Sequence, residues 1–119
     1  MQVQHLVFSS GATSTNSIFA ELPASFQLKS ATVTQNGASV GASGVNYKTL
    51  TISDNGGNTI ATATTVAGWT QGVPVSFTLS GPSYAVLTAG QRFQIAATHT
   101  GAGAEVQAMV TLNLEAARG

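Results

Sequence analysis

The residue types best suited to chemistry lie together in ATHTGAGAEVQA, residues 97–108, which holds a histidine, a Gly-Ala-Gly triplet and a glutamate. A glycine-rich cradle for a dinucleotide requires G-x-G-x-x-G at the start of a helix, so that backbone amides face the phosphates. Here Val106 replaces the third glycine, and the residues after it alternate between apolar and polar as a strand does. We therefore predict that this segment is the turn of a β-hairpin and binds no cofactor.

A metal site is the second chemistry that this segment suggests. His99 and Glu105 are expected to be neighbours across the predicted hairpin, and His5 or Asp54 could complete a set of ligands. Nothing in the sequence makes these residues converge, and no H-x-x-x-H or similar ligand spacing is present. We interpret His99 and Glu105 as the polar edge of the hairpin and predict no bound metal ion.

Nucleophilic catalysis has one near match, GPSYA at residues 81–85. A nucleophile elbow reads G-x-S-x-G and joins a strand to a helix, whereas this stretch ends in Ala85 and no helical pattern follows it. The chain has two histidines and four Asp or Glu residues, which leaves few general acids and bases. We predict a Gly-Pro turn at this position, no catalytic residue, and a protein that is not an enzyme.

The composition narrows the class of protein. The chain has 119 residues, and we expect a single domain covering residues 1–119. Charged residues make up 7% of it, compared with about 25% in an average domain, and the net charge is zero. Four Lys and Arg residues are too few for a nucleic-acid interface that neutralises roughly six to ten phosphates. Cysteine is absent, and no run reaches the roughly 20 apolar residues of a membrane span. We predict neither a nucleic-acid nor a membrane partner.

The elements that must position these residues are β-strands, because apolar residues recur with a period of two along most of the chain. Gly, Asn, Asp and Pro fall between such runs. The pattern predicts eight strands, at residues 2–9, 17–22, 26–35, 45–53, 58–66, 73–79, 91–100 and 105–115. Short strands with glycine-rich turns predict an all-β fold, an eight-stranded antiparallel β-sandwich of the jelly-roll type.

The same alternation predicts which side chains face the core. We expect an inward orientation for Val73, Val75, Phe77, Leu79, Phe93, Ile95, Val110, Leu112 and Leu114. Aromatic residues are only 7% of the chain and alanine is abundant, so the core should be thin. A thin core and a weakly charged surface favour association between copies, and we predict a homo-oligomer.

Strand direction predicts which connections lie together. If consecutive strands run antiparallel, alternate connections fall at the same end of the sandwich. One end then collects most of the glycine-rich loop length, from the connections at residues 11–16, 36–44, 67–72 and 101–104. We predict that this end contacts a partner, through the candidate residues Thr13, Asn16, Asn36, Val40, Trp69 and Gln71.

Trp69, the single tryptophan, leaves two interpretations open. It could cap the open end of the core, or it could be an exposed contact anchor, since tryptophan is enriched at interaction hot spots. The surrounding stretch, VAGWTQG, is a predicted connection and favours neither interpretation.

Three stretches carry a resemblance to a known group of proteins: LPASFQLKSATVTQNG, GVNYKTLTI with the turn DNGGNTIATA, and VLTAGQRFQIAATHTGAGAEVQAMVTLNLE. Together they cover roughly residues 22–115. They resemble the small jelly-roll decoration, or cement, proteins that coat the capsids of tailed phages. Relatives of this kind tend to read Ala-Gly-Asp before the late strand, whereas Gln91 follows Ala-Gly here.

The resemblance implies a non-enzymatic structural protein of the virion that needs no cofactor. Such a protein is made in the host cytoplasm, binds the major capsid protein on the outside of the assembled shell, commonly as a homotrimer, and stabilises that shell. The alternative is a phage tail or fibre module that binds a host-surface carbohydrate, with Trp69 beside Gln71 as its one candidate site.

Overall fold

The computed structural model describes residues 2–15, 17–21, 26–54, 58–79, 86–87 and 92–116. Within these residues the chain forms ten β-strands. The described residues contain no helix that is long and apolar enough to cross a membrane. The strands are β1 (Gln2–Ser10), β2 (Ser17–Glu21), β3 (Phe26–Gln35), β4 (Tyr47–Ser53), β5 (Thr59–Thr64), β6 (Pro74–Ser76), β7 (Thr78–Leu79), β8 (Val86–Leu87), β9 (Arg92–Thr100) and β10 (Val106–Ala116).

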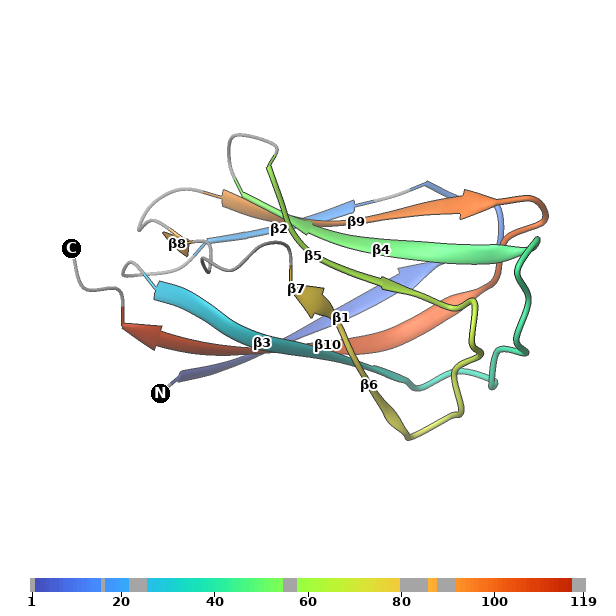
Figure 1. Ribbon diagram of the computed structural model, residues 1–119, viewed down its shortest axis with the longest axis horizontal. Helices are drawn as coiled ribbons and strands as arrows, with labels where there is room; N and C mark the ends of the chain where they lie inside the picture. The colour runs from blue at the N-terminus through green and yellow to red at the C-terminus, as the bar shows by residue number, and fades with distance from the viewer. Residues whose placement is uncertain are drawn as a thin grey trace.

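The strands form two antiparallel sheets that pack face to face as a sandwich (Figure 1). One sheet has the order β1-β10-β3-β6, with β8 also paired to β3, and the other has the order β2-β9-β4-β5-β7. The pairing is nested along the chain: β1 pairs with β10, β2 with β9, β3 with β6, and β4 with β5. This nested order is that of a jelly roll. The predicted all-β, antiparallel sandwich of the jelly-roll type is therefore confirmed.

The number of strands differs from the predicted eight, because the segment expected at residues 73–79 divides between the sheets. Its first part, β6, pairs with β3, and its second part, β7, pairs with β5. The chain changes sheet at Phe77, whose amide still donates to the carbonyl of Ala31 in the first sheet at 2.8 Å. A further strand of two residues, β8, lies within the stretch that was expected to be one long connection.

The core lies between the sheets and follows the alternation along each strand. Of the predicted core side chains, eight lie inward: Phe77, Phe93, Ile95, Val110, Leu112 and Leu114 are buried, and Val75 and Leu79 are partly buried against the core. The prediction for Val73 was wrong, since this side chain is 50% exposed. Val73 belongs to the turn before β6, where its amide donates to the carbonyl of Thr70, so the period of two does not extend to it.

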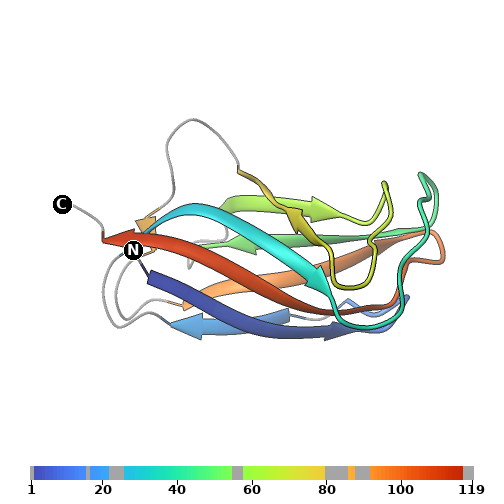
Figure 2. The same ribbon diagram turned by 90° about the horizontal axis from the view of Figure 1, so that it is seen from below.

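The two long sides of the sandwich are built differently. On one side the chain crosses between the sheets through β6 and β7, and Pro74 begins this segment. On the other side β1 and β2 are the outermost strands of their sheets, and each has one neighbouring strand among those described. Figure 2 shows β1 and β2 together along the lower edge of the molecule. We refer to the side formed by β1 and β2 as the open side.

Candidate functional site

Four connections gather at one end of the sandwich, at the right of Figures 1 and 2: residues 11–15, 36–46, 65–73 and 101–105. We refer to this end as the loop end. Val40 and Trp69 join two of these connections through backbone hydrogen bonds of 2.7 and 2.9 Å. The amide of Ala102 joins another pair by donating to Oδ1 of Asn46 at 2.9 Å. The predicted clustering of the four connections is confirmed.

The turn within ATHTGAGAEVQA joins the two sheets and is not the turn of a β-hairpin. β9 pairs with β2 and β4, whereas β10 pairs with β1 and β3, so the strands on either side of the turn do not pair with each other. The hairpin prediction was wrong because a period of two identifies strands but not their partners. Residues 101–105 instead bridge two layers, which lie about 10 Å apart in a sandwich.

Two glycines allow this turn to pack against its neighbours. Gly101 and Gly103 have φ angles of 60° and 68°, in the left-handed region that glycine enters without steric cost. A Cβ atom on Gly103 would meet the carbonyl oxygen of Ala12, and one on Gly101 would meet that of Val45. The Gly-Ala-Gly triplet therefore permits close backbone contact between three connections of the loop end.

A buried lysine organises the connection after β1. Lys48 takes the first inward position of β4, and its side chain has no exposed surface. The ammonium donates to the hydroxyl of Ser10 at 2.8 Å and to the carbonyls of Gly11 and Ser14 at 2.5 and 2.8 Å. An ammonium has three N–H donors, and each has an acceptor here. Lys48 thus ties the end of β1 and the residues that follow it to β4.

Burial lowers the pKa of Lys48 from its ordinary value of 10.5, because the interior removes the hydration of the charged form. No carboxylate among the described residues pairs with this ammonium, and its hydrogen-bond partners there are hydroxyl and carbonyl oxygens. A buried charge that is held by dipoles requires those dipoles to stay oriented towards it. The 11–15 connection is therefore restrained in one arrangement.

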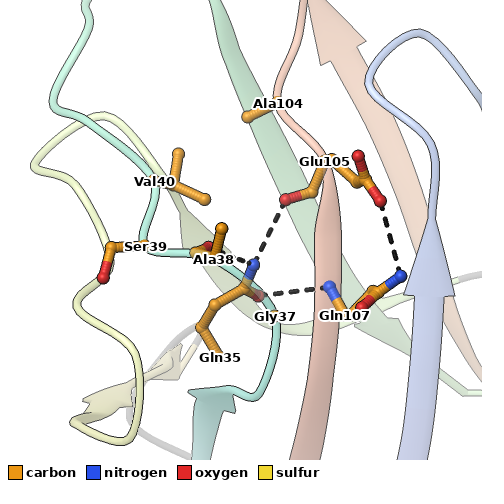
Figure 3. Close-up of a pocket in the computed structure, with 8 residues that line it drawn as sticks. All are labelled: Gln35, Gly37, Ala38, Ser39, Val40, Ala104, Glu105 and Gln107. Atoms are coloured by element: carbon orange, nitrogen blue, oxygen red, sulfur yellow. Dashed lines mark hydrogen bonds between the residues drawn. The ribbon is translucent and has the colours of Figure 1, made fainter.

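A second buried polar side chain, Gln35, ties the 36–46 connection to the turn before β10 (Figure 3). Gln35 ends β3 and is 2% exposed. Its amide nitrogen donates to the carbonyls of Ala38 at 3.0 Å and Glu105 at 3.3 Å, and its amide oxygen accepts from the amide of Gln107 at 3.2 Å. All three partners are backbone groups, so the side chain fixes the position of one segment relative to the other.

Next to Gln35 the surface is hollowed by a cavity of about 270 Å³ (Figure 3). Its lining residues are Gln35, Gly37, Ala38, Ser39, Val40, Ala104, Glu105 and Gln107. Glu105 is the one charged residue in this lining, and its carboxylate accepts a hydrogen bond of 3.4 Å from Nε2 of Gln107. The cavity can receive a small neutral or cationic side chain from a partner. The lining offers a carboxylate but neither a histidine nor a nucleophile paired with a base.

The predicted contact residues lie at the loop end as far as the structure describes them. Asn36 and Gln71 are exposed and joined, since Nε2 of Gln71 donates to the carbonyl of Asn36 at 3.0 Å. Val40 is half-buried beside them and lines the cavity. Thr13 is exposed in the neighbouring connection, and Asn16 lies outside the described residues. The first three therefore form one surface, and Thr13 belongs to an adjacent one.

Of the two interpretations of Trp69, the structure shows the core cap. The side chain is 2% exposed, and its Nε1 donates to the carbonyl of Thr64 at 3.0 Å. Its backbone pairs with Val40 in the next connection. The indole therefore closes the core beneath the connections and adds no surface of its own to the loop end.

The residues considered as metal ligands are separated. His99 lies at the loop end opposite Lys48, whereas Asp54 follows the far end of β4. His5 lies on the outer face of β1, with Nδ1 3.1 Å from Oγ1 of Thr111. Over the part of the chain that the structure describes, no three His, Asp or Glu residues are grouped so that they could hold a metal ion.

Lys48 and Gln35 hold the loop end together, and neither residue was among those predicted from the sequence. Their spacing contained the information, because Lys48 is in step with buried Leu50 and Gln35 is in step with buried Val33. A polar residue in step with the apolar face of a strand indicates a buried polar group that needs partners. The GPSYA stretch, residues 81–85, lies outside the described residues.

No protein-family model and no curated protein matches this chain.

Proposed function

We propose that this protein is a structural protein of a phage virion, which binds the outside of an assembled capsid and stabilises the shell. Jelly rolls occur in viral capsid proteins and also in lectins, so the fold permits this function without identifying it. The proposal is carried by the surface of the loop end, which is fixed in shape and almost free of exposed charge.

Charge is distributed unevenly over the molecule. Five charged residues lie towards the opposite end of the strands: Glu21, Lys29, Asp54, Arg92 and Glu115. At the loop end Lys48 is buried, and Glu105 is the one exposed charged residue among those described there. The centres of protein interfaces are depleted of charged residues, because an unpaired charge is costly to desolvate. The loop end therefore suits contact with another protein.

The shape of the loop end is fixed before any partner binds. Lys48 holds the 11–15 connection, and Gln35 holds the 36–46 connection against the 101–105 turn. Loops that become ordered on binding reduce affinity, so a surface that is already ordered loses less free energy when it docks. Binding across a junction between capsomers would then depend on complementary shape and on buried surface area. A standard protein interface buries about 800 Å² on each partner.

The carbohydrate-binding alternative placed its site at Trp69 beside Gln71, and the burial of Trp69 counts against that site. Gln71 remains exposed, but its Nε2 is already donated to the carbonyl of Asn36. A glycan array that gave a specific signal, lost on replacing Gln71 with Ala, would favour this alternative.

To test the proposal, purified protein is added to capsids that lack it, and the occupancy of the protein on the capsid surface is measured by cryo-electron microscopy. Val45→Arg puts a charge on a loop-end residue that is 70% exposed, and we expect at least tenfold weaker capsid binding because the interface would have to desolvate the cation. Thr59→Arg is the matched control, since Thr59 is exposed at the opposite end, and it should bind like the wild type. Wild-type protein that leaves the capsids bare, or equal binding by all three proteins, would refute the proposal.

A further inference from the structure

We propose that the open side of the sandwich, formed by β1 and β2, binds a second copy of this chain. The inference goes beyond the proposed function, because it names the interface of the homo-oligomer expected from the sequence and does not depend on capsid binding. It locates self-association away from the loop end, on strands whose outer neighbours are absent among the described residues.

The position of these strands makes them a template for pairing. β1 is the first strand of the order β1-β10-β3-β6, and β2 is the first strand of the order β2-β9-β4-β5-β7. Both lie on the same side of the molecule (Figure 2). The outermost strand of a sheet presents backbone donors and acceptors along its outer edge, to which a strand of another chain can pair.

Apolar side chains emerge on both outer faces of the open side and between the sheets. On β1, Val3 is 46% and Val7 is 74% exposed, and on β2, Phe19 is 56% exposed. Leu6 and Ile18 point inward from the same strands but are only partly buried against the core. Val3 and Val7 lie on one face of β1, and exposed apolar groups that lie together mark a surface for interaction.

β1 lacks the features that usually keep outermost strands apart. Its nine residues, QVQHLVFSS, contain no Lys, Arg, Asp, Glu or Pro. Natural sheets block their edges with lysine, proline, bulges or a covering segment. The opposite side of this sandwich has such features, because the chain crosses it and Pro74 begins β6. On β10, the residues paired with Val3 and Val7 are Asn113 and Met109, which are also uncharged.

A second copy matches β1 in charge and the open side in size. Because β1 has no Lys, Arg, Asp or Glu to pair with a charge, its partner must also lack them if no unpaired charge is to be buried, and β1 of another copy meets this condition. Nine residues at about 3.3 Å each make β1 about 30 Å long. The molecule measures 42 × 25 × 24 Å, so one long side offers roughly 1,000 Å², which exceeds the roughly 800 Å² per partner of a standard interface.

The experiment compares Val7→Arg with Val45→Arg, since these valines are 74% and 70% exposed on different surfaces. Oligomeric state is measured by light scattering and native mass spectrometry at micromolar protein. We expect wild type and Val45→Arg to form the same oligomer, and Val7→Arg to dissociate at least a hundredfold more readily, because each copy would bury an unpaired cation. Circular dichroism establishes that each variant is folded, and the double variant Val3→Thr, Val7→Thr replaces Val7→Arg if the arginine prevents folding.

The outcomes separate this inference from the proposed function. A monomeric wild type, or a folded Val7→Arg that associates like the wild type, overturns the inference. A monomeric wild type whose capsid binding is lost in Val7→Arg assigns the open side to the capsid protein, which overturns the inference and leaves the proposed function standing. A wild-type oligomer that Val7→Arg dissociates supports the inference, whether or not any of these proteins binds capsids.

Discussion

Replacing Gln35 with methionine tests whether this buried amide fixes the shape of the loop end. Methionine has a similar length, so the main change is the loss of three hydrogen bonds, to the carbonyls of Ala38 and Glu105 and from the amide of Gln107. A neutral hydrogen bond contributes about 0.5–1.5 kcal/mol, and a partly buried group left without a partner costs somewhat more. We expect the variant to lose roughly 2–4 kcal/mol of the free energy of unfolding, a large share of the about 5–15 kcal/mol typical of a domain.

Urea unfolding of the wild type and two variants measures this loss. Gln71→Met is the matched control, because Gln71 is exposed and donates one side-chain hydrogen bond that water can replace, so it should change stability by less than about 0.5 kcal/mol. The backbone hydrogen bonds from Asn36 and Gly37 to Gln107 remain in Gln35→Met, so the fold should persist while the walls of the cavity move apart. Under the proposed function, capsid binding should weaken together with stability in Gln35→Met. Equal urea midpoints for Gln35→Met and Gln71→Met would refute the role assigned to Gln35.

Two further substitutions test the other contacts of the loop end. The folded protein holds the proton of Lys48 less tightly than the unfolded chain, because burial lowers the pKa of Lys48 from 10.5. The free energy of unfolding should therefore rise as the pH increases through the window between the lowered pKa and 10.5. Urea midpoints should show this rise in the wild type but not in Lys48→Met. Gly103→Ala should cost at least about 1–2 kcal/mol for the left-handed backbone, and more for the clash with Ala12. Gly72→Ala, with a φ of 79° but open space around it, should show the backbone cost alone; an equal loss in both alanine variants would contradict the proposed contact.

The strands could be predicted because burial of one face imposes a period of two, which a single sequence displays. Every predicted strand is present, and the bounds of the first, 2–9, differ by one residue from β1. The pairing of strands could not be predicted in the same way. Residues 101–105 resemble a hairpin turn locally, but β9 and β10 pair in different sheets. In a jelly roll strands that follow one another in the chain commonly belong to opposite sheets, and no residue type records this.

The position of the loop end followed from strand direction, whereas its organisation did not follow from the sequence. Lys48 binds the carbonyl of Gly11, 37 positions away, and Gln35 binds the amide of Gln107, 72 positions away. Both partners are backbone groups, which have no residue type that a motif could specify. Trp69 was left open for a related reason, since its backbone pairs with Val40 of another connection and its indole donates to a backbone carbonyl, that of Thr64.

The two polar residues explain why the sandwich can end in long connections and still present a fixed surface. An apolar side chain at position 48 or 35 would extend the core but would remove the donors that tie the connections of the loop end to the strands. Lysine and glutamine instead supply donors where the strands stop pairing, so the carbonyls of Gly11, Ser14 and Ala38 are hydrogen-bonded to side chains of β4 and β3. The loop end is thereby polar with Glu105 as its one exposed charged residue among those described, while β1 on the open side exposes Val3 and Val7 and has no Lys, Arg, Asp or Glu. Because the loop end is fixed by buried polar side chains and the open side exposes apolar ones, the two surfaces should respond to different substitutions. The proposed binding to a capsid and the proposed association between copies can therefore be disrupted separately.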